Sequence, residues 1–281
     1  MASDQLILYS ALSALAIILV GVFLSKGEPK ERKVLTNEKF QKFPLVAKEK
    51  VNHNSTLYTF GLPRSTDVLG LPVGQHIQIT SEIKGKKVVR SYTPTSLDED
   101  AKGKFQLLIK VYPNGNVSRY IDGLQIGESI EVKGPKGFFT YTPNMVSSLS
   151  MIAGGTGITP MYQIIKAICN NPGDKTEVNL LYANVSEEDI LLRKELDELS
   201  KEHGNIHVYH VLNKPPEGWS AGTGFIDKDL MAKRLPGPSD DSKLLLCGPP
   251  PMVSALKKAA VELGFQKAKP ISKLADQVFV F

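Results

Sequence analysis

Cysteine and histidine are scarce in this chain, whose 281 residues include two cysteines, Cys169 and Cys247, and five histidines. Two cysteines cannot form a disulfide framework, and such low usage is typical of proteins from a reducing compartment. The cysteines and histidines show no metal-ligand spacing and no Cys-x-x-Cys-His pattern. The sequence therefore predicts no structural zinc, no haem attachment and no other metal site.

Repeats, low-complexity segments and a strong charge bias are also absent. The formal net charge is +5, of which part lies in the cluster Lys26, Lys30, Arg32 and Lys33 that would favour anionic lipid. The rest is mild and dispersed, which argues against a nucleic-acid partner and leaves an acidic protein partner open. Neither Gly-x-Gly-x-x-Gly nor a lysine-containing phosphate loop occurs. With 42% hydrophobic and 22% charged residues, the chain has the composition of an ordinary folded protein and is long enough for two domains.

A hydrophobic run without charges lies near the N-terminus. Leu6 to Leu24 spans 19 residues, which as a helix would measure about 28 Å, close to the thickness of a bilayer's hydrocarbon core. A cleaved signal and a buried core helix are the alternatives, but Asp4 precedes the run, no Lys or Arg does, and no clean cleavage site follows. We expect a transmembrane anchor over 1–25 and a charged linker over 26–37. Basic residues directly after the run place the remainder in the cytosol.

Residues 38–145 contain short segments in which hydrophobic and polar residues alternate, separated by residues typical of turns. Gln75 to Thr80, Phe105 to Tyr112 and Ser129 to Lys133 each have the period of a β-strand, with no extended helical pattern between them. Several short strands without intervening helices are typical of an antiparallel β-barrel. We predict such a barrel for the first domain.

Strands alternate with helices from residue 146 onward. The predicted strands are Ser148 to Ala153, Val178 to Ala183, Ile206 to Leu212 and Lys243 to Cys247. The predicted helices are Pro160 to Cys169, Glu187 to Glu202 started by Ser186, and Pro251 to Leu263 ended by Gly264. Such alternation implies right-handed crossovers, so residues 146–281 are expected to form an α/β domain with a doubly wound parallel sheet.

A glycine-rich turn follows the first strand of this second domain. Gly154-Gly155-Thr156-Gly157 has almost no side-chain bulk, and Thr159 before Pro160 resembles an N-cap and first-turn pair. Backbone amides at a helix start attract phosphate, so the turn fits a dinucleotide diphosphate. A tight structural turn between strand and helix is the alternative.

A second motif, Cys247-Gly248-Pro249-Pro250-Pro251-Met252, lies at the carboxyl end of a predicted strand, where open α/β sheets bind ligands. The prolines stiffen the turn, and Gly248 permits the close approach of a flat ring. Cys247 has no base or cation next to it in sequence, so we assign it no nucleophilic role. It packs beside a nicotinamide or is simply a small buried residue.

The barrel segment contains a third motif, Arg90-Ser91-Tyr92-Thr93-Pro94. Arg90 offers a rigid guanidinium to phosphate, and Tyr92 offers a ring and a hydroxyl to a flavin. Gly115-Asn116-Val117-Ser118, ahead of a predicted short helix, is a second phosphate candidate. Taken singly, each of these motifs could be structural, and Lys110 could be an ordinary solvated lysine.

In their order and spacing, these motifs resemble the NADH-cytochrome b5 reductase family of ferredoxin-reductase-like flavoenzymes. The resemblance covers about residues 38–281 and includes Gly134-Pro135-x-Gly137 and the terminal Phe279-Val280-Phe281. It implies FAD on the barrel and NADH on the α/β domain. The implied FAD residues are Arg90, Tyr92, Thr93, Lys110, Tyr112, Gly115, Val117, Ser118 and Thr159. The implied NADH residues are Gly154, Gly155, Thr156, Gly157, Pro160, Cys247, Gly248, Pro249, Pro250, Met252 and Phe281.

The resemblance also implies an activity: hydride passes from NADH to the flavin at a site lined by Thr93, Lys110 and Cys247, and single electrons pass to cytochrome b5. The implied location is the mitochondrial outer membrane, the endoplasmic reticulum, or both. An iron-sulfur protein of diphthamide synthesis, or an acceptor like that of a nitrate-reductase module, is the alternative. A membrane-tethered binding module without cofactor is the alternative outside enzymes.

The charged side chains do not by themselves indicate whether NADH or NADPH is preferred. Relatives often have an acidic residue before the Pro-Glu-x-Trp stretch, where it would repel the extra phosphate of NADPH. Here Asn213 and Lys214 stand at that place. The expected preference for NADH therefore comes from the family resemblance.

Overall fold

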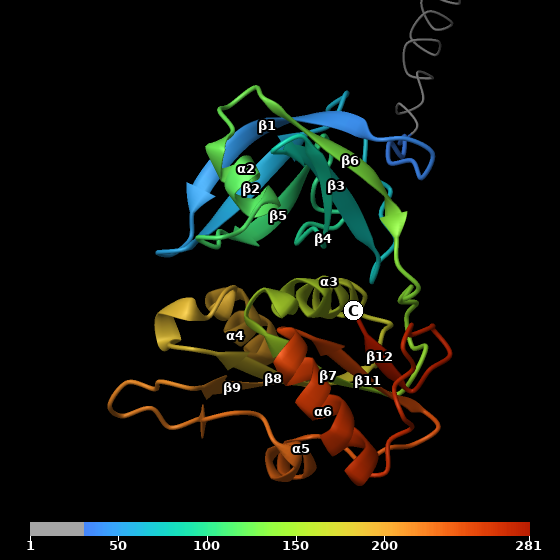
Figure 1. Cartoon of the computed structure of the whole chain (residues 1–281). Coiled ribbons are helices and arrows are strands. Elements are labelled where there is room, and N and C mark those ends of the chain that lie inside the picture. The colour runs from blue at the N-terminus through green and yellow to red at the C-terminus, as the bar shows by residue number, and fades with distance from the viewer. Residues whose placement is uncertain (1–30) are drawn as a thin grey trace, which may run out of the picture.

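The computed structural model describes residues 31–281, which form two sheets joined by a short connection (Figure 1). The predicted membrane span, Leu6 to Leu24, lies outside the described residues. Within residues 31–281 no helix combines the length and the hydrophobicity that a membrane crossing requires.

The first sheet has six strands, and every neighbouring pair is antiparallel. Its elements are β1 (Gln41–Lys50), β2 (Ser55–Gly61), β3 (His76–Ile83), β4 (Lys86–Tyr92), β5 (Lys104–Lys110), α2 (Val117–Gly123) and β6 (Ser129–Lys136). The strand order is β4-β3-β6-β1-β2-β5. The three predicted strands are present as β3, β5 and β6, and the antiparallel class is confirmed.

This sheet is curled around its own core. The end strands β4 and β5 do not form a ladder with each other, but the amide of Thr95, just after β4, donates to the carbonyl of Gln106 in β5 (3.0 Å). Alternate residues point inward, and β5 is buried on both sides. Leu107 packs in the core of the first sheet and Leu108 in the core shared with the second, so β5 lies where the two units meet.

The second sheet has six parallel strands in the order β10-β9-β8-β7-β11-β12. They are β7 (Ser148–Gly154), β8 (Glu177–Asn184), β9 (Ile206–Leu212), β10 (Gly222–Thr223), β11 (Ser242–Cys247) and β12 (Val278–Val280). The chain winds outward from β7 to β10 and then returns to the other side of β7 as β11. The predicted parallel sheet is therefore confirmed, and its order reverses between β7 and β11, where α/β sheets bind ligands.

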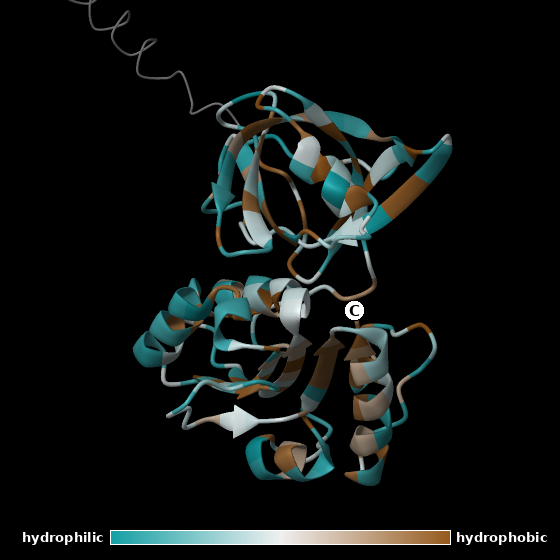
Figure 2. Ribbon diagram, turned by 60° about the vertical axis from the view of Figure 1, so that its left-hand side comes forward, coloured by the Kyte–Doolittle hydropathy of each residue, from teal (hydrophilic) through white to brown (hydrophobic). Residues whose placement is uncertain are grey.

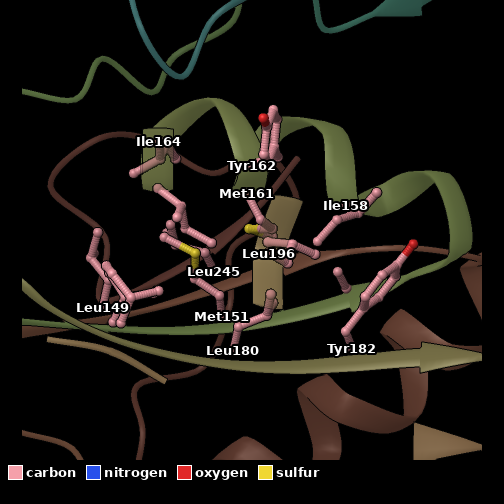
Figure 3. Close-up of a cluster of buried hydrophobic side chains, with 14 of the residues drawn as sticks. Leu149, Met151, Ile158, Met161, Tyr162, Ile164, Leu180, Tyr182, Leu196 and Leu245 are labelled. Carbon is pink, nitrogen blue, oxygen red and sulfur yellow. The ribbon is translucent and has the colours of Figure 1, made fainter. Parts of the chain in front are cut away.

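Helices cover both faces of this sheet (Figure 1). They are α3 (Ile158–Cys169), α4 (Arg193–Glu202), α5 (Lys228–Arg234) and α6 (Pro250–Glu262). Figure 3 shows Ile158, Met161 and Ile164 of α3 packed on the sheet, and the same core contains Leu196 of α4. Figure 2 shows the hydrophobic central strands and the hydrophilic surface of α4, where only Leu196 is fully buried. The α3 side of the sheet faces the first domain, and α5 and α6 pack on the other side.

The predicted helix over Glu187 to Glu202 is wrong in its first part. A 3₁₀ turn, η2 (Glu187–Asp189), is closed by a reciprocal capping box between Ser186 and Asp189, and α4 begins only at Arg193. Leu191 is buried between them, and Leu192 has a left-handed φ of 56°. The left-handed Leu192 interrupts the helical path, and the amide of Leu191 donates to the hydroxyl of Tyr182 (3.2 Å).

The predicted start of the helix at Thr159 and Pro160 is also wrong. A 3₁₀ turn, η1 (Gly155–Gly157), leads directly into α3 at Ile158, so Thr159 lies inside the helix. Its Oγ1 donates to the carbonyl of Thr156 (3.2 Å) instead of capping an amide. The helix predicted from Pro251 begins one residue earlier, and Gly264 follows its end with a φ of 90°, as a C-terminal glycine should.

Candidate functional site

One cavity of about 1160 Å³ lies between the two sheets and receives residues from both. It is larger than the roughly 300–1,000 Å³ of a site for one drug-sized ligand, so it has room for more than one nucleotide. All of the predicted FAD and NADH residues line it. These are Arg90, Tyr92, Thr93, Lys110, Tyr112, Gly115, Val117, Ser118, Gly154, Gly155, Thr156, Gly157, Thr159, Pro160, Cys247, Gly248, Pro249, Pro250, Met252 and Phe281. The structure brings them together, and their individual roles stay predictions.

Arg90 is the cation of the first-sheet wall. It projects from the edge strand β4, and its Nη1 donates to the neighbouring carbonyl of Val89 (2.8 Å). Among residues 31–281 no carboxylate forms a salt bridge with it. Most of the N–H donors of the Arg90 guanidinium are therefore available to bind an anion. Nearby, burial raises the pKa of the Tyr92 phenol to about 12, so the hydroxyl stays protonated and can donate.

The turn before α2 shapes the same wall. A Cβ on Gly115 would lie 2.2 Å from Oγ of Ser118, so only glycine lets the chain pass this hydroxyl. The amide of Gly115 donates to the carbonyl of Tyr112 (2.9 Å), which fixes the turn. Ser118 is itself buried and still lines the cavity.

The glycine turn and the cysteine-proline motif touch each other on the second-sheet wall, because β7 and β11 are neighbours and Ala153 pairs with Cys247. A Cβ on Gly157 would lie 2.2 Å from the carbonyl oxygen of Cys247, and one on Gly154 would lie 2.7 Å from Sδ of Met252. Gly155, with a φ of 53°, has nothing within 4 Å of its Cβ position. Two of these glycines are thus required by packing, and the third leaves the backbone open to a ligand.

Cys247 is poorly suited to be a nucleophile. Burial raises the pKa of its thiol to about 12, so the thiolate is negligible at neutral pH. A Cβ on Gly248 would lie 2.8 Å from Cε of Met252 and 3.2 Å from the amide nitrogen of Gly154, so this glycine is required by the packing of the two motifs, and the prolines that follow start α6. The arrangement offers a neutral, apolar wall.

Asp189 joins the two domains at the edge of the cavity, and the sequence analysis missed it. Its Oδ1 accepts from Nζ of Lys110 (3.1 Å) and from Nδ2 of Asn54 (3.3 Å), both in the first domain. Its Oδ2 accepts from Oγ of Ser186 (3.0 Å) in its own turn. Burial alone would raise the pKa of Asp189, but the hydrogen bonds from Lys110 and Ser186 outweigh it and lower that pKa. The Ser186-x-x-Asp189 spacing could have indicated a fixed carboxylate, but not its partners.

Asn184 and Phe225 are two further lining residues that the sequence analysis missed. Both side-chain polar atoms of Asn184, at the end of β8, are buried without a hydrogen-bond partner among the described residues. Leaving such atoms unsatisfied costs about 1–3 kcal/mol each, so this amide is suited to a polar ligand. Phe225 is 82% exposed at the rim and offers a flat ring. A free guanidinium, an open glycine turn, an unpaired amide and apolar walls together fit a flavin and a nicotinamide dinucleotide.

Comparisons with known proteins agree with this geometry. Residues 42–141 match the family described as oxidoreductase FAD-binding domain, and residues 151–258 match oxidoreductase NAD-binding domain. The chain is thus a two-domain flavin and pyridine-nucleotide oxidoreductase. It is 57% identical over 279 residues to NADH-cytochrome b5 reductase 1 of Scheffersomyces stipitis, covering 99% of this chain and 98% of the relative. It is 63% identical over 257 residues to the protein of that name from Lodderomyces elongisporus, covering 91% and 84%.

A solved structure is similar as well. The cytochrome b5 reductase domain of Ulva prolifera nitrate reductase is 38% identical with a TM-score of 0.81, covering 89% of this chain and 100% of that one. With this identity and coverage, the chain belongs to the NADH-cytochrome b5 reductase family.

Replacing Asp189 with asparagine is expected to slow flavin reduction by NADH about tenfold, equivalent to about 1.4 kcal/mol, while FAD content stays unchanged. The substitution keeps the side chain's shape but leaves Lys110 without its charged partner at the domain boundary. Stopped-flow reduction measures the effect. Asp197→Asn on the surface of α4 is the matched control. An Asp189→Asn rate equal to that of the control would show that the contact has no part in positioning the two domains.

Proposed function

We propose that the protein is a membrane-anchored, FAD-dependent reductase that takes hydride from NADH and passes single electrons to cytochrome b5. The single cavity that gathers all three motifs from two sheets is the observation on which this proposal rests. The names of the most similar relatives support the choice of donor and acceptor. When bound in this cavity, FAD would supply the conversion of one two-electron donor into two one-electron transfers, with the balance NADH + 2 Fe³⁺ → NAD⁺ + H⁺ + 2 Fe²⁺.

On the first-sheet side, Arg90 and Ser118 would hold the FAD diphosphate, with Gly115 and Val117 shaping the turn. Tyr92 and Thr93 would contact the flavin and its ribityl chain. The free guanidinium fork and the protonated phenol support these roles. FAD would thus be held chiefly by the edge strand β4 and the start of α2.

Between the sheets, Thr93, Lys110 and Cys247 would line the place where hydride is transferred, with Tyr112 and Thr159 at its border. Asp189 orients the Lys110 ammonium, and the thiol of Cys247, whose pKa is raised by burial, adds no charge of its own. Phe281 and the prolines of the second motif line the same cavity and would limit the access of water to it. These residues bind and orient, and no general acid is required.

On the second-sheet side, residues 154–157 and Pro160 would hold the NADH diphosphate, and residues 247–250 with Met252 the nicotinamide. Phe225 supplies a ring for the adenine at the rim. Asn213 lines the cavity, but its Nδ2 already donates to the carbonyl of Gly224 (3.0 Å). Lys214 is not among the lining residues. No cation of the lining is thus placed beside Asn213, which supports NADH over NADPH.

The anchor remains part of the proposal because Leu6 to Leu24 lies outside the described residues. The match to the Scheffersomyces stipitis relative covers 99% of this chain and so extends into this run. We place the catalytic domains in the cytosol, on the endoplasmic reticulum or the mitochondrial outer membrane. Alkaline extraction and protease treatment of intact organelles test this: the protein should stay with the membrane, and protease should reach its catalytic domains.

Steady-state assays of the full-length protein in detergent test the activity. With NADH, two molecules of cytochrome b5 haem domain should be reduced per nucleotide, and NADPH should give a kcat/KM at least about tenfold lower. Parity between the two nucleotides would contradict the assignment of the Asn213 region. Ferricyanide reduction without haem reduction would favour a different acceptor, such as an iron-sulfur protein.

A further inference from the structure

A buried side-chain amide crosses the boundary between the two domains. Gln163 lies in the middle of α3, the helix of the second domain that faces the first sheet (Figure 1), and is 1% exposed. Its Oε1 accepts a hydrogen bond from the amide of Gly74 (2.7 Å), and its Nε2 donates to the carbonyl of Pro94 (3.4 Å). Both partners are buried residues of the first domain. One side chain of the second domain therefore holds two separate loops of the first.

The orientation of this amide follows from its partners. A backbone N–H can only donate and a carbonyl can only accept, so the side-chain oxygen of Gln163 must face Gly74 and its nitrogen must face Pro94. A hydrophobic side chain of the same length would leave both backbone groups unpaired, and buried polar groups without a partner destabilise the packing around them. Gln163 is therefore matched to this place by its chemistry as well as by its size.

One end of the amide supports the segment that follows β4. Pro94 comes directly after Thr93, which lines the cavity at the proposed place of hydride transfer. The next residue, Thr95, donates through its amide to the carbonyl of Gln106 in β5 (3.0 Å). The segment around Pro94 is thus fixed within the first domain, and its bond to Gln163 fixes α3 against it.

The other end of the amide supports the loop before β3. A Cβ on Gly74 would lie 2.5 Å from Cδ1 of Phe139, so this loop packs directly on the Phe139 ring. Phe139 packs in turn against Phe281, which lines the cavity (5.6 Å between ring centroids). The bond from Gly74 to Gln163 therefore joins α3 to the ring that supports Phe281.

The helix that carries Gln163 also shapes the nucleotide side of the cavity. The glycine turn 155–157 leads directly into α3, and Thr159 lines the cavity one turn before Gln163. One turn after Gln163, Lys166 forms a salt bridge with Asp100 of the first domain, but both of these side chains are partly exposed. Gln163 itself is not among the described residues that line the cavity, so it acts on the cavity only through its neighbours.

We propose that Gln163 is a positioning residue for hydride transfer, an inference that rests on the function proposed above. Its amide sets the distance between α3, which follows the turn that would hold the nucleotide, and the Thr93–Pro94 segment, which would contact the flavin. Hydride transfer depends steeply on this distance, because the reacting atoms must approach to about 3–3.5 Å. Without the amide a nucleotide would still bind, but it would be held less accurately against the flavin.

The variant Gln163→Met in the full-length protein tests the proposal, because methionine keeps the length of the side chain and removes both hydrogen bonds. Anaerobic stopped-flow over a range of NADH concentrations separates the limiting rate of flavin reduction from the apparent Kd for NADH. The limiting rate should fall about tenfold, while the apparent Kd and the FAD content stay within about twofold of the unaltered protein. NADH deuterated at the transferred position should lower the limiting rate further, which shows that this rate reports hydride transfer.

Asn205→Leu is the matched control, since Nδ2 of Asn205 donates to the carbonyl of Thr176 (2.8 Å) within the second domain. It also removes a side-chain amide and its hydrogen bond, so it should lower the melting temperature but leave the limiting rate unchanged. Gln163→Asn is a second test, because its amide is one methylene too short to reach both partners. It should show a slowed limiting rate even if the methionine variant loses FAD.

Three results would overturn the positioning role. One is a normal limiting rate in Gln163→Met, or in Gln163→Asn where the methionine variant loses FAD; a higher apparent Kd alongside it would place Gln163 in nucleotide binding instead. Another is an equal fall in the limiting rate of Asn205→Leu. The third is loss of FAD from both Gln163 variants, which would make the amide a requirement for folding. Failure of NADH to reduce the flavin of the unaltered protein would instead refute the proposed function.

Discussion

Replacing Arg90 with alanine is expected to leave the purified protein largely without FAD. The guanidinium donates to the carbonyl of Val89, and most of its other N–H groups are available to an anion. A charge-assisted hydrogen bond of this kind contributes about 1.5–3 kcal/mol, so FAD should bind roughly 10- to 150-fold more weakly. The ratio of flavin absorbance to protein absorbance after gel filtration gives the occupancy directly.

Lys87→Ala is the matched control for Arg90, because Lys87 lies on the same strand and contacts the ring of Phe40 outside the cavity. The control should retain FAD. Adding excess FAD to Arg90→Ala should restore its flavin signal, which separates weak binding from misfolding. Equal FAD retention in the unaltered protein and Arg90→Ala would remove Arg90 from the FAD site.

Replacing Gly157 with alanine is expected to slow flavin reduction by NADH about 100-fold, equivalent to about 2.7 kcal/mol, with FAD retained. The new Cβ would lie 2.2 Å from the carbonyl oxygen of Cys247, so the glycine turn and the cysteine-proline motif must move apart. Such overpacking costs about 1–3 kcal/mol in stability as well. Anaerobic stopped-flow with NADH and thermal unfolding measure the two effects.

Gly204→Ala is the corresponding control, since a Cβ at Gly204 meets nothing within 4 Å. It should match the unaltered protein in both measurements. If Gly157→Ala is reduced by NADH at a normal rate, close contact between the two motifs is not needed for nucleotide binding, and the proposed NADH site is misplaced.

Local sequence patterns predicted the two sheets well. The alternation in segments such as Phe105 to Tyr112 indicates half-buried antiparallel strands, and strand-helix alternation after residue 146 indicates a parallel sheet. The glycine turn and the cysteine-proline motif could also be placed at one site from sequence, whereas the Arg90 motif was joined to them only by the family resemblance. Glycines and prolines act through local backbone geometry, and the ends of parallel strands meet at one edge.

Features that depend on contacts between residues far apart in the chain could not be predicted from local sequence patterns. The break at Ile190 to Leu192 arises because Leu191 is buried and its amide donates to the hydroxyl of Tyr182 (3.2 Å). The pairing of Asp189 with Lys110 joins residues 79 positions apart. Neither the missing partners of Asn184 nor the exposure of Phe225 has a periodic signature. These properties follow from contacts between residues far apart in the chain, of which only the Asp189–Lys110 pair joins the two domains.

Anaerobic titration of the purified protein with NADH tests the central claim most directly, namely that one cavity holds a flavin and a nicotinamide against each other. We expect a yellow protein whose flavin absorbance is bleached by about one equivalent of NADH and returns when cytochrome b5 is added. A colourless protein that binds no FAD, or a flavin that stays oxidised in excess NADH, would contradict it.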